Sequence, residues 1–120
     1  MIADRRLKKN KDFQFVFRSG TSKANRQFVV YYRKQPEPSH FRFGISVSKR
    51  VGNAVTRNRI KRCIREVIRQ LEGDLSEGKD YVIIARKPTA NMDFHQIKAS
   101  LVHVLKRAGV LRVQVGREKP

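Results

Sequence analysis

A run of basic residues between positions 49 and 69 offers the clearest chemistry in the sequence. It holds eight Lys or Arg residues and a single acid, Glu66. On a helix, Arg57, Lys61 and Arg65 fall at i, i+4 and i+8 and form one row, although like charges at this spacing destabilise a helix. A guanidinium binds phosphate through a planar fork and stacks on bases. An ordinary solvated face mixes charges of both signs, so this row predicts a phosphate-binding surface instead.

The sequence shows no set of side chains with the spacing of a catalytic or metal site. His40, His95 and His103 lack the spacing of metal ligands, and the ten Asp and Glu residues are scattered without a paired-carboxylate pattern. Cys63 is the one cysteine. It excludes an internal disulfide, fits a reducing cytoplasm, and is expected to be a small buried hydrophobe. We therefore expect no cofactor bound by this chain alone.

Length and charge restrict the class of protein further. The chain has 120 residues, of which 39% are hydrophobic, so we expect one domain over residues 1–120 with one modest core. With 28 Lys and Arg against 10 Asp and Glu, the net charge is +18. Nucleic acid is the expected polyanionic partner, and an anionic membrane surface is the second candidate. No apolar run approaches the roughly 20 residues that span a bilayer, and the N-terminus has no secretory apolar region.

The basic row needs a helix that holds it in place. Residues 55–71 are predicted to form this helix, capped by Asn53 or Thr56. Its apolar side chains recur with helical spacing and predict a face buried in the core, with Cys63 at its edge. These side chains are Ile60, Ile64, Val67, Ile68 and Leu71.

Three strands are expected around that helix. Residues 25–35 are rich in β-branched and aromatic side chains, and residues 41–49 alternate between apolar and small or polar side chains. A short loop at 36–40 separates the two, so we expect them to form an antiparallel pair. Residues 80–88 are apolar enough to be a central strand.

Two further helices complete an α+β fold with one sheet. The first follows Asn10, a possible cap, and stops at Gly20; Phe13, Val16 and Phe17 share one of its faces. By default Phe13 and Phe17 are core residues, and the alternative is that they border a groove and stack on unpaired bases. The last helix covers 94–108, from a cap at Asp93 to Gly109. We expect residues 1–9 to be loose and leave 110–120 open between strand and disorder.

One long stretch resembles the signature of the protein subunit of bacterial ribonuclease P. The stretch is FGISVSKRVGNAVTRNRIKRCIREVIR, and its TRNRIKRCIRE core matches the RNR motif of that family. KKNKDFQFVFRSG is similar to the first helix of the family, ANRQFVVYY to a strand, and YVIIARKPTA to the strand after the RNR helix. The resemblance covers about residues 7–108.

The resemblance implies a fold and a function. The fold would be an α/β sandwich of αββ(β)αβα type, mainly antiparallel, with a left-handed crossover around the RNR helix where general rules favour a right-handed one. The protein would be a cytoplasmic auxiliary subunit that binds the catalytic RNA subunit and the 5′ leader of precursor tRNA and broadens substrate range. The catalytic centre and its Mg²⁺ would belong to the RNA. Neither a membrane nor an obligate protein partner is implied.

The resemblance also assigns two sets of site residues. Those expected to contact the RNA subunit are Lys49, Arg50, Arg57, Asn58, Arg59 and Arg62. Those expected to line the leader cleft are Phe13, Phe17, Tyr31, Lys61 and Arg65. Phe15 departs from the pattern, because the resemblance places a polar residue there.

Three other classes of protein share some of these features. A ribosomal protein would match the charge and size, but not the RNR run with its flanks. A helix-turn-helix DNA-binding protein would need a second helix just before residue 55, where the sequence is strand-like. A membrane-surface peptide would lack the two alternating strands.

Overall fold

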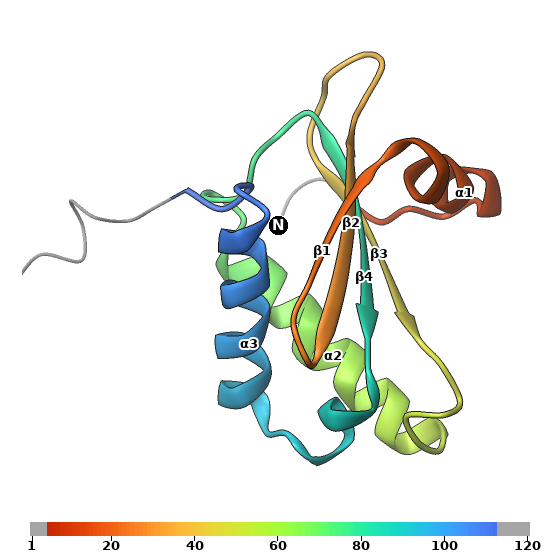
Figure 1. The fold of residues 1–120 in the computed structure, drawn as a ribbon, viewed down its shortest axis with the longest axis vertical. Coiled ribbons are helices and arrows are strands. Elements are labelled where there is room, and N and C mark those ends of the chain that lie inside the picture. Colours follow the sequence, from red (N-terminus) through yellow and green to blue (C-terminus); the bar gives the residue numbers. More distant parts are fainter. Residues whose placement is uncertain (1–4, 113–120) are drawn as a thin grey trace, which may run out of the picture.

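The computed structural model describes residues 5–112, in which a four-stranded sheet carries helices on both faces (Figure 1). The order of elements matches the αββ(β)αβα type that the resemblance implies, with one additional 3₁₀ helix. The elements are α1 Asn10–Ser19, β1 Thr21–Ala24, β2 Phe28–Lys34, β3 Arg42–Val47, α2 Ala54–Gln70, β4 Lys79–Ala85, the 3₁₀ helix η1 Lys87–Asn91 and α3 Phe94–Arg107.

The strand order of the sheet is β1-β2-β4-β3, so β4 lies between β2 and β3. The predicted antiparallel pairing of residues 25–35 with 41–49 is therefore wrong: β2 pairs antiparallel with β4, and β3 pairs parallel with β4. The predicted central position of the third strand is confirmed. Its side chains explain the topology, since Val82 and Ile83 point to opposite faces and both are fully buried. Such a strand is stable where neighbours cover it on both sides.

Helix α2 connects β3 to β4, which are adjacent and parallel, as a crossover connection requires. The resemblance predicted a crossover around this helix. Its left-handed sense stays a prediction.

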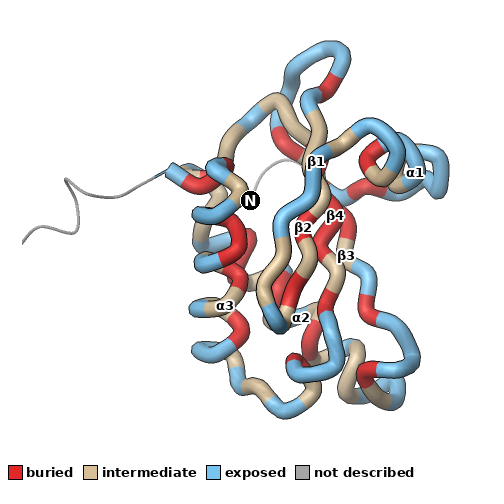
Figure 2. The backbone as a smooth tube through the Cα atoms, in the orientation of Figure 1, coloured by how far each residue is buried: buried red, intermediate tan, exposed pale blue. Residues whose placement is uncertain are grey.

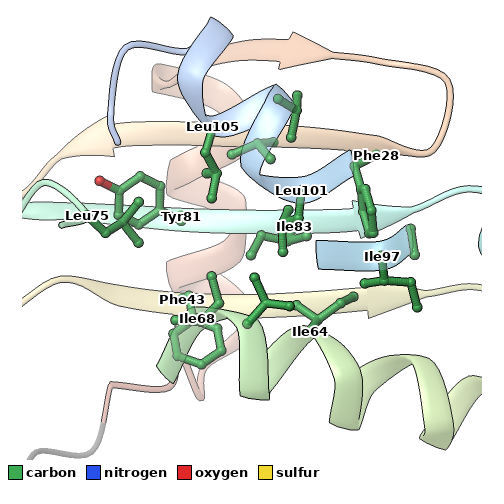
Figure 3. Close-up of a cluster of buried hydrophobic side chains, with 14 of the residues drawn as sticks. Phe28, Phe43, Ile64, Ile68, Leu75, Tyr81, Ile83, Ile97, Leu101 and Leu105 are labelled. Atoms are coloured by element: carbon green, nitrogen blue, oxygen red, sulfur yellow. The ribbon is translucent and has the colours of Figure 1, made fainter. Parts of the chain in front are cut away.

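The main core lies between the sheet and the pair α2 and α3 (Figure 3). The predicted stripe of α2 is confirmed, because Ile60, Ile64, Val67 and Ile68 are fully buried. Helix α3 packs beside it through Ile97, Leu101, Val104 and Leu105. The sheet contributes the alternate residues of its strands. Among them are Phe28 and Val30 of β2, Phe43 and Val47 of β3, and Tyr81, Ile83 and Ala85 of β4.

Side-chain caps fix the ends of α2 and α3. Asn53 accepts a hydrogen bond from the backbone of Thr56, which decides between the two predicted caps of α2. Asp93 and Gln96 form a reciprocal capping box at the start of α3, and Gly109 follows its end with a positive φ of 73°. The predicted cap of α1 is wrong. Asn10 is the first residue of that helix, and the capping position belongs to Lys9, which makes no side-chain cap bond.

Within residues 5–112, α1 is the one helix on the opposite face of the sheet, and much of it is exposed (Figure 2). Val16 and Val82 form the centre of a small second core with Leu7. The expectation of a loose segment up to residue 9 is therefore wrong for residues 5–7. The Phe43 N–H donates to the carbonyl of Arg5, and the Leu7 N–H donates to the carbonyl of Phe43. The Arg5 side chain is buried against Glu72 and Glu77. The first four residues lie outside the described part.

The start of the C-terminal tail also packs against the core. Val110 and Leu111 are buried, Leu111 lies opposite Leu75, and the Arg112 amide donates to the carbonyl of Asp74. Residues 113–120, for which strand and disorder were both left open, lie outside the described part.

The burial of α2 predicts a sharp contrast between two positions on the same helix. Ile64→Ala removes a fully buried side chain and should lower the free energy of unfolding by about 2–5 kcal/mol. Val55→Ala shortens a side chain that is 78% exposed and should change the free energy of unfolding by less than about 0.5 kcal/mol. Urea titrations of both variants measure the difference. Equal losses would mean that α2 is not anchored by this stripe.

Candidate nucleic-acid interface

The basic row on α2 lies beside the buried stripe, as the helical spacing predicted. Lys61 is half-buried and Arg65 is exposed, and both line a cleft at the outer edge of β3. Because Ile60 and Ile64 fix the helix to the sheet, the two cations are held in position by the core and not by ion pairs.

The acid in this run does not neutralise the row. Glu66 accepts hydrogen bonds from Arg69 and Gln70, and the bond from Arg69 is the main cause that lowers the pKa of Glu66 to about 2. Within residues 5–112, no acidic side chain lies within ion-pair distance of Lys61, Arg62 or Arg65. These three cations thus face solvent without a counter-charge, as a surface that binds a polyanion requires.

The cleft joins the first part of the chain, up to α1, with β3 and α2, which are distant from it in the sequence. The N-terminal segment contributes Arg6 and Leu7, α1 contributes Phe13, and α2 contributes Lys61 and Arg65. The floor is the outer edge of β3, formed by Phe43, Gly44 and Ile45, and the volume is about 140 Å³. The result is a basic cleft with one aromatic wall.

Phe13 lies directly on Gly44. A Cβ added to Gly44 would lie 2.3 Å from Cζ of Phe13, closer than any side chain allows. The glycine is thus required by the approach of the ring, since only a residue without Cβ leaves this space. Gly44 thus leaves room for the distal end of the Phe13 ring against the sheet, where this ring forms a wall of the cleft.

Phe17 and Tyr31, which were also predicted to line the cleft, are not among the residues that line it and form a second aromatic group in this region. Their ring centroids are 4.9 Å apart in an edge-to-face arrangement. Phe13, Phe17 and Tyr31 pack against the small core of Leu7, Val16 and Val82, yet each remains partly exposed. The two phenylalanines are therefore partly packed, as core residues would be, and partly accessible; stacking on unpaired bases stays a prediction.

The remaining predicted contact residues lie on the turn before α2 and on the first half of this helix. Lys49 and Arg50 lie in the exposed turn, Asn58 is exposed on the second turn of α2, and Arg62 is exposed at the middle of the helix. Arg57 is half-buried, and its Nε donates to the carbonyl of Gly52. The first turn of α2 carries no acid. The positive end of the helix dipole therefore adds to the basic side chains there.

Arg59 has a different environment from the other arginines of the run. Its two terminal nitrogens donate to the carbonyls of Ala90 and Met92, each at 3.0 Å. These bonds tie α2 to η1 and to the residue that follows it. The side chain that the resemblance assigns to RNA contact thus has a structural partner inside the protein.

Sequence reasoning missed five residues that line the cleft: Arg6, Leu7, Phe43, Gly44 and Ile45. The first two were included in a segment that was expected to be loose. Gly44 did give a signal, because a glycine inside an alternating strand marks a close approach by another group.

The sequence of this chain matches known proteins along nearly its whole length. A sequence model of the family described as Ribonuclease P matches residues 1–109. The ribonuclease P protein component of Listeria innocua serovar 6a is 60% identical over 114 residues, which are 95% of this chain and 96% of that protein. That of Bacillus cereus is 55% identical over 109 residues, 91% of this chain and 95% of the relative.

Solved structures share the fold. The RNase P protein of Staphylococcus aureus superposes with a TM-score of 0.86 at 51% identity, covering 92% of this chain and 100% of that one. A variant of the Staphylococcus aureus protein, described as having defective mRNA degradation activity, superposes with a TM-score of 0.85 at 51% identity. The match covers 89% of this chain and 90% of that one. The Thermotoga maritima RNase P protein, in complex with 1-(4-fluorophenyl)-2-thiourea, superposes with a TM-score of 0.78 at 37% identity. The match covers 85% of this chain and 98% of that one.

The two bonds of Arg59 predict that it matters for stability while its neighbour Arg62 does not. Arg59→Ala removes charge-assisted bonds to two carbonyls and should lower the free energy of unfolding by about 1–2 kcal/mol. Arg62→Ala removes the same side chain from an exposed position and should change it by less than about 0.5 kcal/mol. Thermal and urea unfolding of both variants check this. If Arg59→Ala is as stable as Arg62→Ala, Arg59 does not hold α2 to η1.

Proposed function

The chain belongs to the ribonuclease P protein family and is a subunit of that tRNA-processing enzyme, and we propose that it binds RNA with two separate surfaces. The N-terminal end of α2 would contact the catalytic RNA subunit. The basic cleft at the edge of β3 would hold the 5′ leader of precursor tRNA. This family assignment replaces the alternative of a ribosomal protein.

The open cleft between α1 and α2 is the observation that carries the leader assignment. Uncompensated Lys61 and Arg65 suit the phosphates of an extended strand, and the partly exposed Phe13 offers a ring to an unpaired base. Phe17 and Tyr31 continue the aromatic surface on the same side of α1. A duplex does not offer its base faces in this way, whereas a single strand does.

The surface for the RNA subunit is supported by exposure and charge. Lys49 and Arg50 are exposed before α2, and Asn58 and Arg62 are exposed on its first half. Arg57 keeps the terminal nitrogens of its guanidinium for a ligand while its Nε bonds to Gly52. Arg59 is assigned a supporting role here, because its terminal nitrogens are already bonded to carbonyls.

The cleft side chains are suited to binding and not to proton transfer. The guanidinium of Arg65 offers N–H donors and no acceptor, so it suits the oxygens of a phosphate. Magnesium prefers carboxylate and phosphate oxygens, and the side chains that line the cleft offer no carboxylate. They do not fit a magnesium site. We therefore assign the catalytic centre and its Mg²⁺ to the RNA subunit, with this protein as the auxiliary subunit.

Nothing in this scheme calls on a membrane. In the part of the chain that the structure describes, every helix is too short or too polar to cross a bilayer. A cytoplasmic location, which the single cysteine favours, stays a prediction.

Leader dependence is the test of the cleft. In holoenzyme reconstituted with saturating protein, Phe17→Ala should weaken binding of leader-bearing precursor tRNA by roughly 1–3 kcal/mol for a lost stacked base. Lys61→Ala and Arg65→Ala should each make the plot of log binding constant against log salt concentration shallower. The slope should change by about 0.7 for each phosphate contact that is lost. Mature tRNA has no leader, so its affinity should not change. Filter-binding titrations over a range of salt concentrations measure these effects.

Two controls separate the cleft from other effects. Lys106→Ala removes one exposed charge from α3, which contributes nothing to the cleft, and should leave leader binding unchanged. Arg62→Ala should weaken assembly with the RNA subunit without regard to the leader. The leader assignment is wrong if Phe17→Ala, Lys61→Ala and Arg65→Ala each weaken binding of precursor tRNA and of mature tRNA equally.

The assignment of chemistry to the RNA makes a separate prediction. Protein purified free of RNA should not cleave precursor tRNA, because the cleft holds cations and aromatic rings and no group that activates water. Cleavage should appear when the RNA subunit and Mg²⁺ are added. An mRNA substrate belongs in the same assay, in view of the activity ascribed to the Staphylococcus aureus protein. Cleavage of precursor tRNA by the RNA-free protein would place a catalytic site in this chain.

A further inference from the structure

The outer face of α1 carries an exposed aromatic ring that the cleft does not use. Phe15 is 56% exposed, and the other exposed large hydrophobic side chain within residues 5–112 is Val55. Phe15 points away from the small core that Phe13, Val16 and Phe17 share. Burial in this protein therefore does not explain why position 15 is aromatic.

Basic and polar side chains surround this ring. Lys11, Gln14 and Arg18 line one hollow with Phe15, since positions 11, 14, 15 and 18 share one face of a helix. From β2, the guanidinium carbon of Arg33 lies 5.4 Å from the centre of the Phe15 ring. One aromatic ring is thus set among three cations that belong to two elements.

The charge of this face is not balanced locally. Asp12, the acid of α1, points toward the sheet, where its Oδ2 lies 3.8 Å from a terminal nitrogen of Arg42. Within residues 5–112, no acidic side chain lies within ion-pair distance of Lys11, Arg18 or Arg33. An apolar protein partner would gain little from three uncompensated cations, whereas a polyanion with flat bases would use both the cations and the ring.

We propose that the outer face of α1 is a second single-strand RNA contact, in which Phe15 stacks on an unpaired base and Lys11, Arg18 and Arg33 bind the flanking phosphates. The occupant is the part of the 5′ leader that extends beyond the nucleotides held in the cleft. This inference rests on the proposed leader cleft and extends it.

Position in the fold favours the leader over the RNA subunit. The proposed RNA-subunit surface begins at the turn before α2 and extends to Arg62, and Figure 1 shows the start of α2 at the lower end of the molecule and α1 in its upper half. The cleft, in contrast, uses the inner face of α1 itself, through Phe13. A strand that leaves the cleft beside Phe13 reaches the outer face by passing over a helix of ten residues.

The test uses holoenzyme and a series of precursor tRNAs whose leaders grow one nucleotide at a time. Phe15→Ala should leave binding of short leaders and of mature tRNA unchanged. Beyond one leader length it should weaken binding about five- to tenfold, at the lower end of what one stacked base contributes. Because the side chain is largely exposed, the melting temperature should not fall.

Substitutions of matched size identify the kind of contact. Phe15→Trp keeps a stacking ring and should bind long leaders at least as well as the unchanged protein. Phe15→Leu keeps the apolar character without the ring and should behave like Phe15→Ala. Arg18→Ala should make the salt dependence shallower for long leaders alone, while Lys106→Ala, with the same loss of charge on α3, should not.

Each other outcome overturns the inference. A loss in Phe15→Ala that is independent of leader length and also affects binding of the free RNA subunit would place that RNA on α1. If Phe15→Leu binds like the unchanged protein, or if sedimentation shows a dimer that Phe15→Ala dissociates, the ring contacts protein. If no variant changes any affinity, the face binds no RNA.

The experiment tests the leader cleft and the contact on the outer face of α1 independently. Phe17→Ala should already weaken binding of the shortest leaders that reach the cleft. If it does so while Phe15→Ala has no effect at any length, the cleft stands and the second contact is wrong. If neither substitution responds to the leader, the proposed leader cleft itself is wrong.

Discussion

Burial of one face of α2 against the sheet is the constraint on which the rest of this structure depends. The fully buried Ile60, Ile64, Val67 and Ile68 hold the helix along its length. Lys61, Arg62 and Arg65 lie between these anchors in sequence, so the core fixes where the three charges stand. Their mutual repulsion costs about a few tenths of a kcal/mol per pair. This is small beside the burial of a single isoleucine, at about 1.5–3 kcal/mol.

The unequal covering of the sheet turns this charge into a binding surface. Two helices cover one face, so that side is closed by a continuous apolar core. On the other face a single helix of ten residues packs through Val16 onto Val82. Beside it, the outer edge of β3 stays open from Gly44 onward, and the cations of α2 reach this edge from the opposite layer. The cleft exists because the layers on the two faces differ in extent.

Arginines in this chain serve at least three physical purposes. Arg5 is buried in ion pairs that hold the N-terminal segment to the body of the protein, where loss of a partner would leave a charge without solvent. Arg59 bonds two carbonyls and connects α2 to η1. Arg62 is exposed and makes no such bond within the described residues. Net charge therefore indicates the class of ligand, whereas the partners of each guanidinium decide which residues are available to it.

The sequence by itself determined the features that depend on local spacing. The 3.6-residue period of α2 and the alternation in residues 41–49 predicted which side chains are buried, and the RNR run identified the family. Pairing of strands was decided only in three dimensions: β2 and β3 follow each other along the chain, yet β4, buried on both faces, lies between them. The ordering of residues 5–7, the contact of Phe13 with Gly44 and the partners of Arg59 were likewise decided there. Each joins segments distant along the chain, and a local pattern records which face of an element is apolar but not which element covers it.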